Sequence, residues 1–449
     1  MREKLILVKK IASDIKDIGG NMYFVGGYVR DKLLGHESKD IDVEIFNITP
    51  KQLKDILLKY GEVDEVGSTF GILMIKGIDI DFAMPRTEVK VGEGHQGFEI
   101  NINPFLSLKD ASKRRDFTIN ALMEDVLTGE LIDLWSGEKD LQSKIIKHID
   151  ETTFIEDPLR VFRACQFASR FNFRINSKTL DLCRNIDTSM LAKERIFEEL
   201  KKSLIKSDRP SVFFNYLYEM NQMDIFFKEI KELKSVPQSE IHHPEGDVWN
   251  HTMMVIDECS KLKNLTSEPL FFMLSGLCHD IGKPCCTQIK EDGKITSIFH
   301  DIEGVEISRR FLSRLTTHKK AIEYVTNMVE LHMRANMLAK SNSSFKSSRK
   351  MFNKSINGKD LILLAKADHL GRLHSSAYDE YEKWLNSRLK DFNEVCSEPL
   401  VKGKDLIEMG YKPSREFSVI LEQAYKLQMS GQSKYQIIKH LNLKEMKKA

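Results

Sequence analysis

The sequence predicts an α+β protein, in which a mixed β-sheet domain at the N-terminus is followed by regions that are entirely helical. Strand-like apolar segments, separated by glycine and other turn residues, are confined to about the first 125 residues. After about Leu141 the apolar residues recur at helical spacing to the end of the chain. A chain of 449 residues is long enough for two to four domains with cores of their own.

Composition argues against several classes of protein. The chain is 41% hydrophobic and 30% charged, and no apolar run is long enough to predict a membrane span. Its first twenty residues are amphipathic, unlike a secretory signal. The seven cysteines are scattered and odd in number, which favours reduced thiols in a cytoplasmic protein. Since the net charge is only +2, nucleic acid would have to bind local basic runs such as residues 193–209, 340–354 and the last twelve, although such runs are more often solvated helix faces.

The first predicted strand, residues 23–25, leads into two glycines, Gly26 and Gly27, and then into a predicted helix over residues 29–34. Glycines at a strand-to-helix turn let the backbone approach a ligand closely. The helix N-terminus that follows offers free N–H groups to phosphate. The turn therefore predicts a phosphate cradle.

Two carboxylates follow on the next predicted strand, residues 41–45. Asp40 and Asp42 are two residues apart and alternate with apolar residues, so a strand would place both on one face. Such a pair beside a phosphate cradle suits magnesium and phosphoryl transfer. A solvated edge strand is the ordinary explanation of an isolated acidic pair, and the glycine turn just upstream argues against it here.

Two further strands are predicted over residues 71–76 and 78–84. On the second, Asp79 and Asp81 share a face, and either could supply the third carboxylate of a two-metal site. An acidic edge strand is again the alternative.

The motif Gly26-Gly27-x-Val29-Arg30-Asp31, followed by Asp40-x-Asp42, resembles the class II tRNA nucleotidyltransferase and poly(A) polymerase family. Such enzymes add nucleotides to an RNA 3′ end without a template. The resemblance implies a palm-like nucleotidyltransferase fold for the N-terminal domain and Mg²⁺ bound by Asp40 and Asp42. It favours Asp81 as the third carboxylate and places Gly26, Gly27 and Arg30 around the triphosphate.

A second motif, Arg114-Arg115-Asp116 followed by Phe-Thr-Ile-Asn-Ala, resembles the family's second motif and follows the first in the expected order. Two guanidinium groups can grip triphosphate or ribose oxygens bidentately. Asp116 would orient one arginine or accept a hydrogen bond from a ribose hydroxyl. All three are therefore predicted to bind nucleotide.

The segment Glu156-Asp157-Pro158-Leu159-Arg160 opens a helix and has two interpretations. Local physics explains it as an Asp157 N-cap, Pro158 at the first helical position and a Glu156–Arg160 ion pair. The family resemblance implies instead that Asp157 and Arg160 read the edge of the incoming base, which replaces a template strand. Arg163 belongs to the same predicted set, and residues 194–199 resemble the family's supporting helix.

A third group of residues lies far downstream. His251, then His279-Asp280 within His-Asp-Ile-Gly-Lys, and finally Asp368 follow the ligand order of the HD metal-dependent phosphohydrolase superfamily, which the segment resembles. Nitrogen and carboxylate ligands together suit a transition metal such as Ni²⁺, Co²⁺ or Mn²⁺. His300 and His332 fall where they would complete a second metal site. His242 and His243 are not included in the predicted site.

These motifs predict four domains. We expect a nucleotidyltransferase head over residues 1–125, a helical neck that binds RNA and the nucleobase over 126–235, an HD domain over 236–395 and a helical tail over 396–449. The resemblance implies CCA addition to tRNA 3′ ends from CTP and ATP, with neither DNA nor a membrane as partner. It also implies hydrolysis of phosphate esters by the HD domain.

Three alternatives stay open. A poly(A) polymerase would carry Gly-Arg-Arg-Phe where residues 66–71 read Val-Gly-Ser-Thr-Phe-Gly, so that choice is disfavoured. An enzyme that adds only A or only CC is compatible with the motifs. In the third alternative, an HD phosphohydrolase carries a transferase-like domain that only binds RNA, and the intact Asp40 and Asp42 argue against it.

Overall fold

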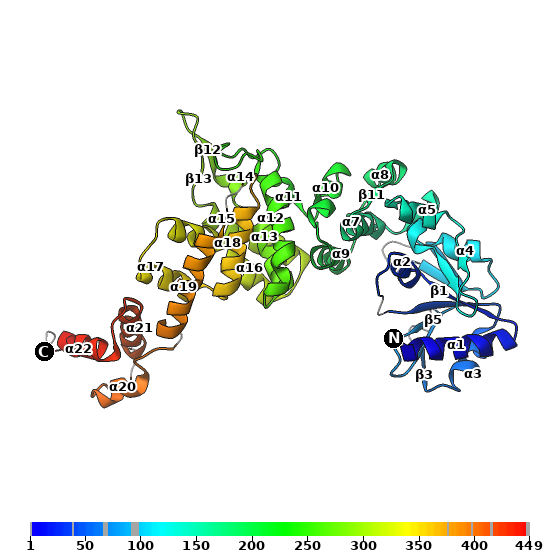
Figure 1. Ribbon diagram of the computed structural model, residues 1–449, viewed down its shortest axis with the longest axis horizontal. Coiled ribbons are helices and arrows are strands. Elements are labelled where there is room, and N and C mark those ends of the chain that lie inside the picture. Colours follow the sequence, from blue (N-terminus) through cyan, green and yellow to red (C-terminus); the bar gives the residue numbers. More distant parts are fainter. Residues whose placement is uncertain are drawn as a thin grey trace. The chain divides into compact units, whose positions relative to one another are not determined.

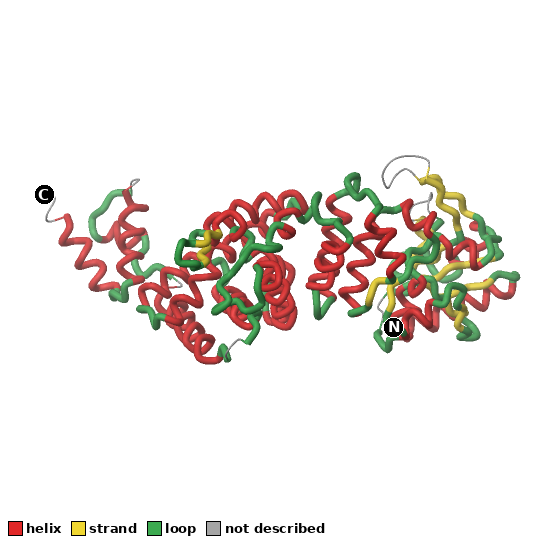
Figure 2. The backbone as a smooth tube through the Cα atoms, turned by 90° about the horizontal axis from the view of Figure 1, so that it is seen from above, coloured by secondary structure: helices red, strands yellow, loops and turns green. Residues whose placement is uncertain are grey.

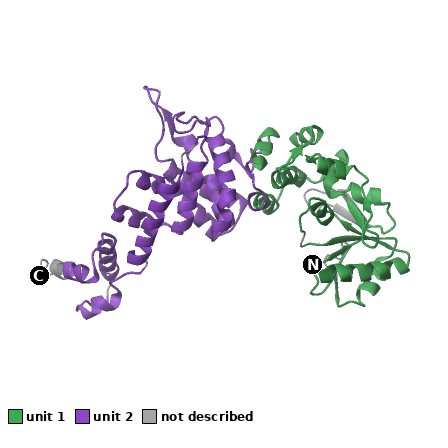
Figure 3. Ribbon diagram, viewed as in Figure 1, with its two compact units in different colours: residues 1–203, 212–222 green, residues 204–211, 223–449 purple. Residues whose placement is uncertain are grey.

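The computed structural model of the protein describes residues 2–37, 40–65, 71–90, 98–374, 377–396, 398–413 and 416–445. The chain divides into two compact units (Figure 3). Unit 1 comprises residues 1–203 and 212–222, and unit 2 comprises residues 204–211 and 223–449. Most strands belong to unit 1, and unit 2 is almost entirely helical (Figure 2). The finer division into four domains remains a prediction.

Unit 1 is built on a mixed seven-stranded sheet. The pair β2–β5 is parallel and the other neighbouring pairs are antiparallel. Strand β2 lies between β5 and β1, in the middle of the sheet. The order across the sheet is β3 (Val63–Glu65), β4 (Ile72–Ile75), β5 (Asp81–Ala83), β2 (Asp42–Phe46), β1 (Asn21–Val25), β8 (Met123–Asp125) and β9 (Leu131–Ile132).

The predicted strands at 23–25, 41–45 and 71–76 are confirmed as β1, β2 and β4. The strand predicted over 78–84 is shorter and covers only residues 81–83. The chain turns at Gly77, whose φ is +79°, and Ile78 donates its backbone N–H back to Ile75 O at 2.9 Å. Residues 78–80 therefore belong to the turn rather than to the strand.

Helices cover both faces of this sheet (Figure 1). On one face lie α1 (Arg2–Asp17), which buries an apolar stripe at helical spacing, and α3 (Pro50–Leu57), which Thr49 caps. On the other face α2 (Gly27–Leu33) packs on β1. A separate antiparallel hairpin is formed by β6 (Arg86–Lys90) and β7 (Phe98–Ile102).

The rest of unit 1 is helical, as predicted, apart from one short parallel pair, β10 (Ile145–Ile146) with β11 (Arg174–Ile175). Two-residue strands are too short to leave an alternating pattern in the sequence. The helices are α4 (Leu108–Lys113), η1 (Thr118–Asn120), α5 (Gly137–Gln142), α6 (Glu151–Glu156), α7 (Leu159–Phe171), α8 (Ser177–Arg184), α9 (Lys193–Lys206) and α10 (Ser211–Glu219), with α9 and α10 partly in unit 2.

The core of unit 2 surrounds α13 (Pro269–Cys278), which is buried over seven consecutive residues, 272–278. Around it pack α12 (Val248–Leu262), α16 (Lys319–Lys340) and α18 (Gly358–Leu370). The other elements here are α11 (Lys228–Lys231), η2 (Lys263–Leu265), α14 (Lys283–Cys286), the hairpin β12 (Thr287–Ile289) with β13 (Ile295–Ser297), α15 (His300–Leu315), α17 (Phe345–Lys354) and α19 (Asp379–Cys396).

The C-terminal helices have a small core of their own, centred on Val401, Leu406, Ala424, Ile437 and Leu441. These helices are α20 (Gly403–Glu408), α21 (Glu416–Met429) and α22 (Lys434–Glu445). Among the described helices, none combines the length and the apolar content that crossing a membrane would require. All seven cysteines are free thiols.

Candidate functional site

The glycine turn between β1 and α2 lies directly beside charged side chains. Gly26 has φ +66°, a conformation that disfavours other residues. A Cβ atom there would lie 3.2 Å from Nη1 of Arg115 and 3.9 Å from Oδ2 of Asp42. Gly27 begins α2, and its Cβ position lies 3.5 Å from Nη2 of Arg30. The turn thus brings bare backbone up to predicted site residues, as a phosphate cradle requires.

Asp42 and Asp81 are opposite each other in the parallel register of β2 and β5, so their side chains leave the sheet on the same face. Both are half-buried, whereas Asp40 is exposed just before β2. Burial and the neighbouring Asp81 carboxylate raise the pKa of Asp42. Asp79 lies outside the strand, is 77% exposed and pairs with Lys4 at 3.3 Å. The geometry therefore favours Asp81 over Asp79 as the partner of Asp42.

A buried acid to which the sequence analysis gave no role holds the two arginines of the second motif. Glu44, two residues after Asp42 on β2, is fully buried and accepts from Nη2 of Arg114 and Nη2 of Arg115 at 3.0 Å each. Burial alone would raise the pKa of Glu44, but the two guanidinium groups hold it below its ordinary value. The run Asp40-x-Asp42-x-Glu44 could have indicated Glu44 as a site residue, because alternate residues of a strand lie on one face.

Asp116 and Arg30 belong to a second buried network. Asp116 accepts from Nε of Arg163 at 2.7 Å and from the side-chain amide of Asn120 at 2.9 Å. Arg30 is only 4% exposed, donates to Asp31 at 2.8 Å and to Oδ1 of Asn120 at 2.5 Å. The guanidinium of Arg30 also lies over the Phe167 and Phe171 rings. Arg30 thus ties α2 to α7 and to Asn120, and its contact with a triphosphate remains a prediction.

The candidate base-reading pair lies at the junction of α6 and α7. Pro158 takes the N-cap position of α7, one residue later than predicted, and Asp157 accepts the N–H of Leu159 at 3.2 Å. Oδ2 of Asp157 also pairs with Nη2 of Arg195 on α9 at 3.0 Å. Arg160 donates to the backbone carbonyls of Thr153 and Arg114 at 2.5 Å each. Arg195 belongs to the predicted supporting helix, residues 194–199, but was not itself a predicted site residue.

In unit 2 the predicted histidines and aspartates converge on one buried point. Three rings donate Nδ1 to a carbonyl three residues back: His279 to Gly276 at 2.8 Å, His300 to Ser297 at 2.6 Å and His332 to Val329 at 2.6 Å. This fixes the ring orientation and turns each Nε2 toward Asp280, at 3.1, 3.3 and 3.7 Å respectively.

His251 is oriented differently. Its Nδ1 lies 2.9 Å from Oε1 of Glu245, while its Nε2 faces Oδ1 of Asp368 at 3.2 Å and Oδ2 of Asp280 at 3.7 Å. Glu245 is buried and also contacts Nδ1 of His243 at 2.9 Å. A carboxylate behind a histidine ligand raises its basicity and fixes its tautomer. Glu245 and His243 were both outside the predicted site, since an acid six residues before a histidine forms no recognisable spacing.

Two cations face the same centre. Nζ of Lys283 lies 2.7 Å from Oδ2 of Asp280, and Nη2 of Arg372 lies 3.1 Å from Oδ1 of Asp368. Burial alone would raise the pKa of Asp280, but His279 and Lys283 hold it well below its usual value. The carboxylate is therefore ionised and ready to serve as a ligand.

The donor set fits divalent metal. Among the described residues, the buried Nε2 atoms of His279, His300 and His332 point at the Asp280 carboxylate without forming a hydrogen bond of good geometry. His251, His279 and Asp280 form one group with ligand atoms within 4.8 Å of one another, and Asp280, His300 and His332 form another. The carboxylates of unit 1 are not gathered so tightly in the described part of the chain. Asp280 belongs to both groups, an arrangement that suits one or two borderline cations.

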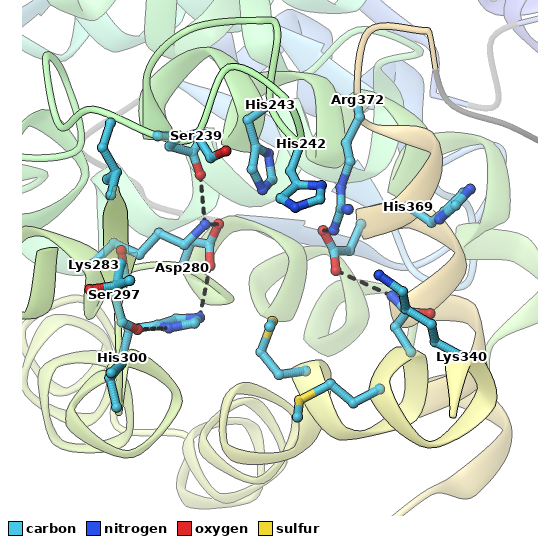
Figure 4. A pocket seen from close by; sticks show the side chains of 18 of the residues that line it. Ser239, His242, His243, Asp280, Lys283, Ser297, His300, Lys340, His369 and Arg372 are labelled. Atoms are coloured by element: carbon cyan, nitrogen blue, oxygen red, sulfur yellow. Dashed lines mark hydrogen bonds and ion pairs between the residues drawn. The ribbon is translucent and has the colours of Figure 1, made fainter. Parts of the chain in front are cut away.

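A cavity of about 510 Å³ opens onto this centre. Lys283, Asp280 and His300 lie on one side of it, and Lys340 and His369 lie on the opposite side (Figure 4). His242, His243 and Arg372 lie between them (Figure 4). The rest of the lining is mixed: it contains the apolar side chains of Ile295, Ile298, Met333 and Met337, together with Tyr381 and polar residues such as Asn336.

Comparison with known families agrees with both sites. Residues 22–147 match the family described as Poly A polymerase head domain. Residues 248–373 match the family described as HD domain. The first match contains the glycine turn, the carboxylates and the paired arginines, and the second contains every predicted histidine ligand.

Among solved structures, the chain is similar to the Bacillus stearothermophilus CCA-adding enzyme in complex with CTP, with a TM-score of 0.69 and 19% identity over 100% of both chains. It is also similar to the Thermotoga maritima CCA-adding enzyme complexed with tRNA, with a TM-score of 0.63 and 17% identity over 99% of this chain and 98% of that one. At these identities the likeness concerns the fold.

Sequence relatives are closer. The multifunctional CCA protein of Psychromonas ingrahamii is 39% identical over 269 residues, which cover 58% of this chain and 63% of that protein. The multifunctional CCA protein of Actinobacillus pleuropneumoniae serotype 5b is 32% identical over 365 residues, which cover 78% of this chain and 86% of that protein. The chain therefore belongs to the multifunctional CCA protein family.

Proposed function

We propose that this protein adds CCA to tRNA 3′ ends from CTP and ATP, and that its HD region is a second, separate phosphohydrolase site. The observation that carries the first activity is the Asp42–Asp81 pair, placed by strand register on one face beside the Gly26 turn and Arg115. In the reaction the terminal ribose oxygen bonds to the α-phosphorus of the nucleotide and pyrophosphate leaves.

The side chains of unit 1 divide this work. Mg²⁺ held by Asp40, Asp42 and Asp81 would supply the positive charge that phosphoryl transfer needs. Arg114 and Arg115, held by Glu44, present their remaining N–H groups to the triphosphate. Bare backbone at Gly26 and Gly27 admits the phosphates, and Arg30 fixes α2 behind them.

Asp157 and Arg160 select the base in this proposal. Arg195 holds Asp157, and the carbonyls of Thr153 and Arg114 hold Arg160, so each side chain has a fixed direction. Arg163 supports them through Asp116. A fixed acceptor and donor set can discriminate between base edges without a template strand.

For the HD site we propose hydrolysis of phosphate esters such as a 2′,3′-cyclic phosphate or a 3′-terminal phosphate. Water oxygen bonds to phosphorus while the bond to a ribose oxygen breaks, and that oxygen leaves with the proton. A transition metal such as Ni²⁺, Co²⁺ or Mn²⁺, held by His251, His279, Asp280, His300, His332 and Asp368, would activate that water. Lys283 and Arg372 face the same point and would bind the phosphate oxygens.

Sequencing the 3′ ends of tRNAs that lack CCA, CA or A, after incubation with CTP and ATP, tests the first activity. Restoration of CCA on all three supports the proposal. Poly(A) tails, only A or only CC would each indicate one of the alternatives.

Residues 66–70, which disfavour a poly(A) polymerase by sequence, lie outside the described residues. Since its substrates are tRNA and nucleotides, we place the protein in the cytoplasm.

A further inference from the structure

Part of the lining of the cavity at the HD centre is aromatic and basic. Tyr381 on α19 and Lys340 at the end of α16 both line the cavity. Lys340 lies on the side away from Lys283 and His300 (Figure 4). The chain leaving Lys340 leads into α17, and α19 packs against α16, α17 and α18. The wall of the cavity is therefore continuous with the surface formed by α17 and α19.

One face of α19 carries this surface outward. Tyr381, Trp384 and Arg388 are three and then four residues apart, so a helix aligns them along one side. The indole N–H of Trp384 donates to Oδ1 of Asn342 at 2.8 Å, which holds the ring against the turn after Lys340. Beyond it, the guanidinium carbon of Arg388 lies 4.8 Å from the Trp384 ring centroid.

Phe345 at the start of α17 completes the aromatic series. The Arg388 guanidinium carbon lies 3.6 Å from its ring centroid, and Nη2 of Arg388 donates to Ser343 O at 3.3 Å. Phe345 is 48% exposed although it is a large apolar side chain. The guanidinium group of Arg388 therefore contacts two aromatic rings, those of Trp384 and Phe345.

The positive charge of this surface comes mainly from the segment that contains α17, because α19 also carries acidic residues such as Glu380, Glu382 and Asp391. Residues 340–354 contain five basic side chains and no acidic one. Arg349 pairs with Asp391 and Lys354 pairs with Glu330. Lys340, Lys346 and Lys350 are exposed and have no ion-pair partner in the described part of the chain. Positive charge without internal partners complements a phosphate backbone.

We propose that this surface binds the single-stranded 3′ end of an RNA and leads its terminal nucleotide into the HD cavity. We call it the RNA track and define it as Tyr381, Trp384, Phe345, Lys340, Lys346 and Arg388. Aromatic rings beside cations are the means by which proteins hold single strands without reading sequence. The inference rests on the proposed phosphohydrolase function and adds its substrate: the HD site acts on the end of an RNA chain in preference to a free nucleotide.

The test compares two substrates of the full-length protein, each ending in the same 2′,3′-cyclic nucleotide. One is a single-stranded pentanucleotide and the other is the mononucleotide. We expect the wild type to have the lower KM for the pentanucleotide. Trp384→Ala should raise that KM about tenfold through the loss of base stacking, while kcat and KM for the mononucleotide stay unchanged. Trp384→Phe, which keeps a ring, should restore most of the difference.

Salt dependence tests the lysines. Lys346→Ala should reduce the slope of log KM against log salt for the pentanucleotide by about 0.7, one phosphate contact. Lys390→Ala is the control, because Lys390 is exposed on α19, pairs with Glu394 and lies about 120° around the helix from Trp384. An unchanged KM in Trp384→Ala, or the same change in Lys390→Ala as in Lys346→Ala, would overturn the track. Equal loss on both substrates in Trp384→Ala would overturn it as well.

Cross-linking separates failure of the track from failure of the phosphohydrolase proposal. A pentanucleotide with 4-thiouridine at the penultimate position should cross-link to residues 340–346 or 381–388, whether or not it is hydrolysed. If the wild type hydrolyses neither substrate with any metal but these peptides are labelled, the RNA track stands and the hydrolase proposal fails. If no label appears there, the track is wrong.

Discussion

At the scale of single residues, one buried acid holds the basic side chains of the transferase site. Glu44 is the only partner that the two motif arginines share among the described residues, and it is fully buried on a central strand. A buried carboxylate between two guanidinium groups is stabilising only while all three remain charged. The orientation of Arg114 and Arg115 toward the nucleotide therefore depends on the charge of Glu44.

We expect Glu44→Gln to lower the free energy of unfolding of unit 1 by about 3 kcal/mol at pH 7 and to raise KM for CTP and ATP. The folded pKa of Glu44 lies below its ordinary 4.5, so its stabilising contribution is complete above that pH. It is lost as pH falls through the folded pKa, and the difference between wild type and variant should shrink in acid. Urea unfolding at several pH values measures this.

Glu62→Gln provides the control for that experiment. Glu62 pairs with Lys76 at 3.1 Å with both side chains largely exposed, so its loss should change stability by less than about 0.5 kcal/mol at any pH. If Glu44→Gln were as mild as this control, the buried pair would have no role in holding the arginines.

Single residues also show what the sequence could and could not predict. Asp42 was predicted because the alternation of its strand is visible locally, whereas alternation left Asp79 and Asp81 open and the family resemblance favoured Asp81. Arg195 lies 38 residues from Asp157, and Glu245 contacts a histidine six residues away around a loop. Neither contact follows a helix or strand period. Only the folded chain brings such partners together, so the sequence yielded candidate metal ligands but not the residues that support them.

At the scale of elements, the junction of α6 and α7 is positioned by α9. Asp157 is directed by Arg195, and both side chains are part-buried. We expect Arg195→Ala to release Asp157 and to increase the use of UTP and GTP relative to CTP and ATP, with triphosphate binding largely kept. Incorporation of each nucleotide into tRNA measures the ratio.

Arg184→Ala is the matched control for Arg195→Ala, because Arg184 pairs with Asp181 on an exposed face of α8. It should leave base selection unchanged. If Arg195→Ala changed total activity but not the ratio of UTP and GTP use to CTP and ATP use, Asp157 would not select the base. Its role would then be limited to the start of α7.

A second element-scale prediction concerns the contact between the HD turn and α15. A Cβ atom at Gly282 would lie 2.2 Å from His300 O and 2.7 Å from Gly304 N. Gly282→Ala must therefore push the start of α15, and His300 with it, away from Asp280. We expect kcat/KM of the metal-dependent phosphohydrolase to fall at least roughly tenfold and metal affinity to weaken. Calorimetric titration with Mn²⁺ measures the second effect.

Gly403→Ala is the control, since nothing lies within 4 Å of its Cβ position and its φ is not in the left-handed region. Normal metal affinity in Gly282→Ala would mean that His300 is not a ligand. Gly282 lies within the HD motif of the sequence, but the close approach of two helices leaves no periodic pattern. Only the structure therefore explains why a glycine is required at this position.

At the scale of the whole molecule, the chain contains two candidate sites with different ligand chemistry in two compact units. Unit 1 offers carboxylates only, which suits Mg²⁺, and unit 2 mixes imidazole with carboxylate, which suits transition metals. The order of the head and HD domains was predictable because Gly26-Gly27 with Asp40-x-Asp42 and His279-Asp280 are short local motifs, while the ligand sets remain predictions. The short strand pairs β10–β11 and β12–β13 were not predictable, since two or three residues show no alternation.

The last prediction is that the two activities separate by single substitutions. Asp42→Ala should abolish nucleotide addition and leave phosphoester hydrolysis unchanged, because it removes a carboxylate of unit 1 only. Asp280→Asn should do the reverse, because Asp280 belongs to both groups of metal-ligating atoms around His251, His279, His300 and His332. CTP and ATP incorporation and hydrolysis with nickel, cobalt or manganese are measured on the same preparations, with circular dichroism as the folding control. Loss of both activities in either folded variant would show that the sites are not independent, because a ligand confined to one unit would then be needed by the other.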